Sequence, residues 1–293
     1  MFRGAITALV TPFADGELDK KALERHINWQ ISQGIDGLLP CGTTGETPSL
    51  TEDEQDMVIS TAIRLAKEKK IPVIAGAGTN STAKTVKAVK RVAGLGADAA
   101  LVVTPYYNKP TQEGLYCHYA EICEKTDFPV VIYNVPSRTG GNILPETVQR
   151  LSAKYKRIVA VKEASGKLDQ ATDIVRRCGD KVAVLSGDDS LTLPLLSVGG
   201  KGVISVVSNI VPYDMANMVR FFEQGDLGAA LTLHQKLYPL MKALFVETNP
   251  GPVKAACGVL GINSGDLRLP LAPVTEENFE RIRLAIGKYG IQV

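Results

Sequence analysis

Residues Ile158-Val159-Ala160-Val161-Lys162 form a continuous apolar run that ends in a lysine. The run is rich in β-branched residues and does not alternate between apolar and polar positions. This pattern is typical of a parallel strand that is buried on both faces. We therefore expect a strand over Ile158–Val161, with Lys162 at its C-terminal end.

Seven further runs of the same kind occur along the 293-residue chain, with helical patterns between them. These predicted strands are Ala5–Val10, Gly37–Leu39, Pro72–Ala75, Ala99–Val103, Pro129–Tyr133, Val182–Leu185 and Val203–Val207. One intervening segment begins with the capping box Thr51-Glu52-Asp53-Glu54, which marks a helix start. An open doubly wound sheet would give a similar order. However, eight regular units spaced by roughly 20 to 35 residues favour a (β/α)8 barrel.

The chain continues beyond the eighth unit with three more helical patterns, at about Asp226–Val246, Pro252–Leu260 and Glu276–Lys288. No linker-like stretch precedes them. We expect a catalytic barrel over residues 1–224 and a helical extension over residues 225–293 that packs on the barrel.

Charge and composition exclude several classes of protein. The 33 basic and 31 acidic residues are interspersed, which disfavours nucleic acid as a partner. No signal-like h-region and no 18-residue apolar run occur, so we expect a cytoplasmic protein without a membrane partner. Three isolated histidines and the absence of a Cys-x-x-Cys pair argue against a metal site.

The five cysteines fit reduced thiols in a reducing compartment. Cys41 lies beside a polar loop, where a reactive role is conceivable. A small apolar packing role is the favoured interpretation.

Polar residues gather directly after the predicted strands, where a barrel of this type places its active site. Lys162 stands out, because an apolar environment disfavours its charged form and makes the amine nucleophilic toward a carbonyl. The alternative is a structural ion pair with Glu163 or Asp188. The glycine-rich segments Gly42–Gly45 and Gly76–Gly78 match no nucleotide-binding motif, although the first could cradle an anion.

Tyrosines and an arginine follow neighbouring strands. Tyr133 ends the fifth strand and Tyr107 follows the fourth, so a phenol hydrogen-bonded through Thr43 could shuttle a proton. From the residues alone, core packing or oligomer contact is the favoured interpretation of each tyrosine. Arg138 follows a Pro-Ser turn and could bind a carboxylate bidentately, or form an exposed salt bridge.

With these residues assembled, the sequence closely resembles the 4-hydroxy-tetrahydrodipicolinate synthase (dihydrodipicolinate synthase) family of pyruvate-imine aldolases, which are N-acetylneuraminate lyase-like. The resemblance runs nearly end to end. It rests on five motifs: Gly42-Thr43-Thr44-Gly45-Glu46, Thr104-Pro105-Tyr106-Tyr107-Asn108, Tyr133 to Gly140, Val161 to Gly166, and Ser186-Gly187-Asp188-Asp189.

The resemblance implies a lyase of lysine biosynthesis by the diaminopimelate route. Pyruvate would form a Schiff base with Lys162, and its enamine would attack L-aspartate-4-semialdehyde. Tyr133 would carry protons through Thr43 to Tyr107 of a neighbouring subunit. No metal or organic cofactor is implied, because the covalent pyruvate imine is the electron sink.

The resemblance also assigns substrate-binding positions and an assembly. Thr44, Ile204 and Gly187 would line the pyruvate pocket, and Arg138 would receive the semialdehyde's carboxylate. A homotetramer built as a dimer of dimers is the family's usual form, although dimers also occur.

Feedback by lysine is expected to be weak or absent. Relatives that lysine inhibits often carry histidines and a glutamate around an inter-subunit lysine site. The matching positions here are Glu52, Gln55 and Lys84, although Asn80 and Tyr106 remain. Lys84 would place a positive charge where the ligand's ammonium group binds.

Two rival hypotheses remain open from sequence. Another pyruvate-dependent class I aldolase, acting on N-acetylneuraminate or a 2-keto-3-deoxy sugar acid, would share the lysine and the tyrosine. The second rival is a non-catalytic barrel that binds pyruvate-like acids as a sensor or scaffold. It is disfavoured because the residue expected for catalysis is present at every catalytic position.

Overall fold

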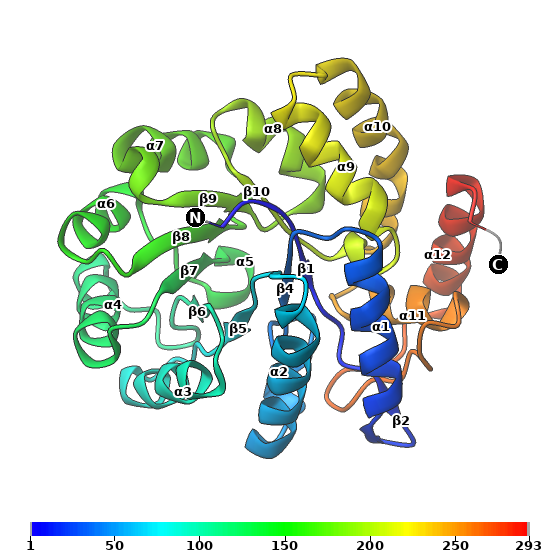
Figure 1. Ribbon diagram of the computed structural model, residues 1–293, viewed down its shortest axis with the longest axis horizontal. Coiled ribbons are helices and arrows are strands. Elements are labelled where there is room, and N and C mark those ends of the chain that lie inside the picture. The colour runs from blue at the N-terminus through cyan, green and yellow to red at the C-terminus, as the bar shows by residue number, and fades with distance from the viewer. Residues whose placement is uncertain (1, 292–293) are drawn as a thin grey trace.

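The computed structural model describes residues 2–291 and contains a sheet of eight parallel strands (Figure 1). Their order is β4-β1-β10-β9-β8-β7-β6-β5. A parallel bridge between Leu38 and Val73 joins the first and last strands of this order, so the sheet curls into a barrel. The predicted (β/α)8 fold is confirmed. The strands are β1 (Gly4–Ala8), β4 (Gly37–Leu39), β5 (Ile74–Gly76), β6 (Ala99–Val103), β7 (Val130–Asn134), β8 (Ile158–Glu163), β9 (Ala183–Ser186) and β10 (Gly202–Ser205).

Helices surround the barrel on the outside (Figure 1). The predicted capping box is present, because the Thr51 hydroxyl accepts from the Glu54 N–H group and the Glu54 carboxylate accepts from the Thr51 N–H group. The barrel helices are α1 (Lys20–Ser32), α2 (Glu52–Lys67), α3 (Thr82–Leu95), α4 (Gln112–Thr126), α5 (Pro136–Thr139), α6 (Pro145–Lys154), α7 (Leu168–Cys178), α8 (Thr192–Ser197) and α9 (Pro212–Glu223). Short 3-10 turns cover Thr47–Ser49, Gly179–Lys181, Asp189–Leu191 and Val207–Asn209.

A hairpin that the sequence analysis missed follows β1. It consists of β2 (Phe13–Ala14) and β3 (Glu17–Leu18), paired antiparallel. Strands of two residues are too short to produce a readable periodicity.

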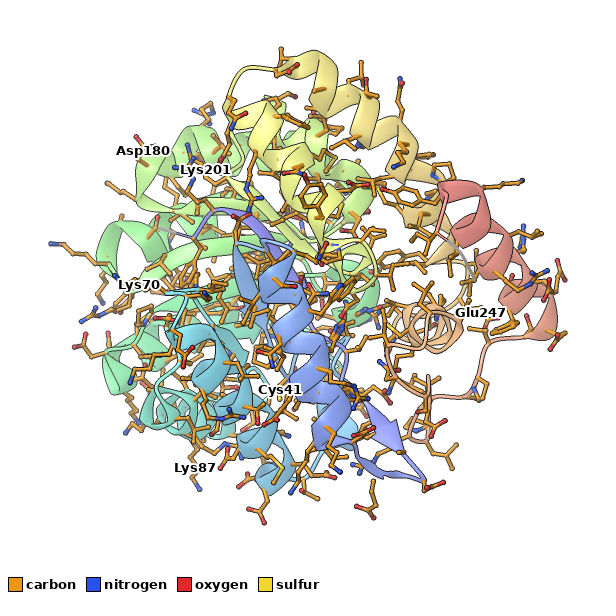
Figure 2. The ribbon with its side chains drawn as sticks, turned by 45° about the vertical axis from the view of Figure 1, so that its right-hand side comes forward. Cys41, Lys70, Lys87, Asp180, Lys201 and Glu247 are labelled. Carbon is orange, nitrogen blue, oxygen red and sulfur yellow. The ribbon has the colours of Figure 1, made fainter. Side chains whose placement is uncertain are left out.

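Three helices after the barrel form the predicted extension: α10 (Leu227–Ala243), α11 (Gly251–Val259) and α12 (Glu276–Tyr289). Helix α10 contacts α9 and α12, and α11 contacts α12 and the turn after β10. Glu247, beside α12 in Figure 2, accepts hydrogen bonds from Thr275 and Asn278 at the start of that helix. The extension thus packs on the barrel, while a domain boundary at residue 224 stays a prediction.

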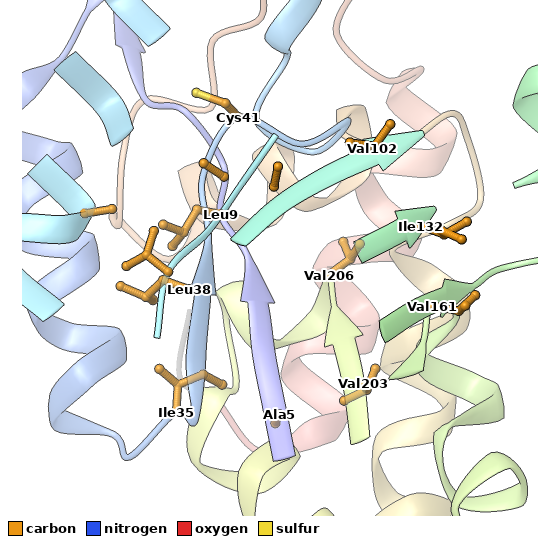
Figure 3. Packing of buried hydrophobic residues seen from close by; sticks show 14 of the residues in the cluster. Ala5, Leu9, Ile35, Leu38, Cys41, Val102, Ile132, Val161, Val203 and Val206 are labelled. Atoms are coloured by element: carbon orange, nitrogen blue, oxygen red, sulfur yellow. The ribbon is translucent and has the colours of Figure 1, made fainter. Parts of the chain in front are cut away.

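Successive residues of each strand point alternately to the helices and to the barrel interior. Val102, Ile132 and Val161 belong to the buried layer between strands and helices (Figure 3). Val131 and Ala160 belong to the separate cluster inside the barrel. Because Lys162 lies two positions after Ala160 in β8, its side chain is directed into the barrel. Within residues 2–291, no helix is long and apolar enough to cross a membrane.

The barrel wall has no room for a side chain at Gly76. A Cβ there would lie 1.7 Å from the carbonyl oxygen of Cys41. Gly76→Ala should therefore lower the free energy of unfolding by about 3 kcal/mol or more, measured by urea titration. The control is Gly94→Ala in α3, where a Cβ meets nothing within 4 Å. That change should raise stability by about 0.5–1 kcal/mol, and equal effects of the two substitutions would contradict the packing argument.

Candidate active site

Lys162 lies at the C-terminal end of the barrel, where β8 pairs with strands on both sides. Its register partners are Tyr133 in β7 and Leu185 in β9. The side chain is only 6% exposed, and Nζ lies 4.4 Å from the centre of the Tyr133 ring. The two residues that sequence analysis assigned to chemistry are therefore neighbours.

Burial lowers the pKa of Lys162 to about 8. The charge of Asp189 opposes this shift, and the charge of Arg138 adds to it. A lysine with a pKa near 8 has a substantial fraction of neutral amine near neutral pH, which is the form that attacks carbonyl carbon.

The predicted alternative, an ion pair with Glu163 or Asp188, is not formed. The Glu163 carboxylate accepts hydrogen bonds from Asn134, Gln170 and the backbone N–H group of Ser165. The Asp188 carboxylate accepts from Ser190 at the start of a 3-10 turn. Both carboxylates thus have structural partners of their own.

The Tyr133 phenol faces Lys162 from the next strand. Burial raises its pKa, while the charge of Arg138 and a hydrogen bond with Thr43 act in the opposite direction. The phenol therefore keeps its proton at neutral pH, as a proton donor requires. Thr43 thus lies beside the Tyr133 phenol, and the proton relay that the sequence analysis assigned to these two residues stays a prediction.

Arg138 and Thr44 are joined by Asn249, a residue that the sequence analysis did not identify. Arg138 Nη2 donates to the backbone carbonyl of Asn249 at 3.1 Å, and Asn249 Nδ2 donates to Thr44 Oγ1 at 3.1 Å. The side chain of Asn249 is buried, and its Oδ1 has no partner among the described residues. The sequence marks Asn249 in only one way: it is a polar residue directly before Pro250, between two apolar helical patterns.

The remaining predicted residues divide into two groups. Gly187 lies against Lys162, because a Cβ there would be 3.2 Å from Lys162 Cε, and Ile204 is buried in the same interior cluster as Tyr133. Tyr107, in contrast, is 89% exposed on a backbone with φ of 73°. Within one chain, the exposed Tyr107 does not join the buried Lys162. The role of Tyr107 in the active site of a neighbouring subunit stays a prediction.

Cys41 is buried, and burial raises the pKa of its thiol to about 12. It is therefore a poor nucleophile, and packing is its role. All five cysteines are free. Among residues 2–291, no group of three or more His, Cys, Asp and Glu side chains could hold a metal ion.

A (β/α)8 barrel with a buried lysine of lowered pKa beside a buried tyrosine defines the class of Schiff-base-forming, aldolase-type lyases. The model of the Dihydrodipicolinate synthetase family matches residues 1–288, and the chain belongs to this family.

Named relatives agree along the full length. The chain is 54% identical over 291 residues to 4-hydroxy-tetrahydrodipicolinate synthase of Syntrophus aciditrophicus, covering 99% of each sequence. It is 51% identical to the enzyme of the same name from Thermodesulfovibrio yellowstonii, again over 99% of each. The crystal structure of dihydrodipicolinate synthase from Thermotoga maritima superposes with a TM-score of 0.97 at 49% identity, covering 100% of both chains.

Burial of Lys162 makes the site costly to fold. Because folding lowers the Lys162 pKa from 10.5 to about 8, the unfolded chain binds more protons between these values, and stability rises with pH through this window. Lys162→Met should therefore stabilise the protein at pH 7 by on the order of 3 kcal/mol. Thermal unfolding measured from pH 7 to 10.5 should show this advantage shrinking. A constant difference would refute the assigned pKa.

Proposed function

We propose that this chain condenses pyruvate with L-aspartate-4-semialdehyde, the 4-hydroxy-tetrahydrodipicolinate synthase reaction of the diaminopimelate route to lysine. The observation that carries the proposal is the contact of the buried Lys162 amine with Tyr133. Relatives about half identical over the whole chain carry this enzyme's name.

The chemistry begins with the neutral Lys162 amine attacking the ketone carbon of pyruvate. The Tyr133 phenol donates a proton to the departing hydroxyl, which leaves as water and gives the imine. The resulting phenolate accepts a proton from the pyruvate methyl group, giving the enamine. Because the protonated imine nitrogen takes up the electron pair, this sequence requires no metal or organic cofactor.

The enamine carbon then attacks the aldehyde of the second substrate, and the new alkoxide takes a proton. The substrate's own amino group closes the ring on the imine carbon and releases Lys162. Thr44, Gly187 and Ile204 hold the pyruvate portion in this proposal. Arg138 holds the semialdehyde carboxylate, because its guanidinium is unpaired with any carboxylate and hydrogen-bonds only a backbone carbonyl among the described residues.

Tyr107 belongs to the proposal as a residue supplied across a subunit interface. Its high exposure leaves the phenol available to another copy of the chain. We place it with Thr43 and Tyr133 in a proton relay within a homotetramer, a dimer of dimers. One solved relative at 49% identity is described as a monomeric dihydrodipicolinate synthase variant.

Borohydride reduction tests the imine directly. With pyruvate present, mass spectrometry should find the reduced adduct on Lys162, and Lys162→Arg should give none. Condensation with aspartate semialdehyde should exceed cleavage of N-acetylneuraminate or 2-keto-3-deoxy sugar acids by orders of magnitude. An unlabelled wild-type protein would sink the Schiff-base mechanism, whereas labelling with preferred sugar-acid cleavage would favour the rival aldolase.

Inhibition by lysine should be weak or absent. The Gln55 side chain is already engaged, because its Nε2 donates to the Thr47 and Leu50 carbonyls and its Oε1 accepts from Arg91. The Lys84 charge would repel an ammonium ligand. In a coupled assay, half-inhibition at sub-millimolar lysine would contradict this expectation. Lys84→Glu should increase sensitivity to lysine.

A further inference from the structure

The loop that carries Thr43 and Thr44 ends in a buried carboxylate, Glu46, whose partner comes from the helical extension. Glu46 Oε1 lies 2.5 Å from Nζ of Lys254 in α11, and Oε2 accepts the backbone N–H group of Arg268 at 3.1 Å. The two charged side chains are 1% and 0% exposed. Neither residue has a part in the proposed chemistry.

Lys254 is bonded to more than Glu46. Its Nζ also donates to the carbonyl of Thr11 at 2.9 Å and lies 4.1 Å from the centre of the Phe13 ring. The Thr11 hydroxyl in turn donates to the carbonyl of Gly45 at 2.7 Å. The ammonium group therefore joins α11 to the loop and to the segment after β1.

The same part of the extension contacts the substrate-binding residues. Asn249 lies two positions before α11 and hydrogen-bonds both Thr44 and Arg138. Glu247 ties the other side of this segment to α12. Asn249 thus lies between two fixed points of the chain. One is Glu247, which hydrogen-bonds the start of α12, and the other is Lys254, which pairs with Glu46.

A buried ion pair such as Glu46–Lys254 can position neighbouring groups without adding to the stability of the fold. A buried ion pair can often be replaced by neutral side chains of similar size without loss of stability, whereas removing one partner leaves a costly unpaired charge. A pair that is dispensable for stability can still fix the placement of the groups attached to it.

We infer that Glu46 and Lys254 are positioning residues: their ion pair sets α11 against the loop and so places Asn249, Thr44 and Arg138 for carboxylate binding. The inference rests on the proposed function. Thr44 contacts pyruvate in both the ground state and the transition state, so misplacing it should weaken binding more than it slows chemistry.

The test is the double variant Glu46→Gln/Lys254→Met, which removes both charges. Its KM for pyruvate, and the pyruvate concentration for half-maximal borohydride trapping on Lys162, should rise about tenfold, the cost of a hydrogen bond to a charged group. The kcat should change by a smaller factor than the KM, because Lys162 and Tyr133 stay on their strands and only Thr43, which hydrogen-bonds Tyr133, moves with the loop.

The control is Asp36→Asn/Arg220→Met, which removes a partly exposed ion pair. This pair joins α9 to the opposite end of the barrel, beside the start of β1. It should leave the KM for pyruvate within about twofold of wild type, although it too removes an ion pair. A similar rise in both double variants would assign the effect to general loosening and overturn the inference.

The single variant Glu46→Asp keeps both charges but shortens the acidic side chain by one methylene group, so no buried charge is left without a partner of opposite sign. It is measured in the same way and decides the matter if the double variant does not fold. A wild-type KM in a folded variant overturns the inference, as does failure of both variants to fold, which would make the pair a folding requirement. Absence of trapping in the wild type would instead overturn the proposed function, and the inference with it.

Discussion

Transfer of a lysine amine from water to the barrel interior is the interaction on which the rest of the site depends. Burial lowers the pKa of Lys162 to about 8, the negative charge of Asp189 limits this shift, and the positive charge of Arg138 adds to it. Asp189 is itself buried and held by the N–H groups of Val206 and Val207. A more exposed lysine would be charged and unreactive, and a more isolated one would cost more to fold.

The barrel supplies the rigidity that such a site needs, and the extension completes it. Strand pairing fixes Lys162 opposite Tyr133 without any loop. Arg138 and Thr44, the residues that we propose bind carboxylates, are held instead by contacts between the barrel loops and the segment around Asn249. In this proposal, the residues of the chemistry and those of substrate binding are held in place by different parts of the chain.

Much of the fold could be predicted from sequence because it depends on local, repeated signals. Continuous apolar runs revealed all eight strands, and the end of one such run identified Lys162. Tyr133 and Arg138 were identified from their positions after predicted strands, and the resemblance to the family gave their roles and added Thr44. Asn249 and the pairing of Glu46 with Lys254 were not found, since partners about 200 residues apart leave no periodic trace. The β2–β3 hairpin was too short to detect.

The pairing of β1 with β10 has a consequence for synthesis of the protein on the ribosome. Strand β1 gains its second neighbour only after β10, the last strand of the barrel in chain order, has been translated. Contacts so distant in sequence close slowly, and the incomplete barrel exposes apolar surface in the meantime. Asn249 emerges later still. In our proposal, a nascent chain would therefore contain Lys162 and Tyr133 well before it contains the segment that positions the carboxylate-binding residues.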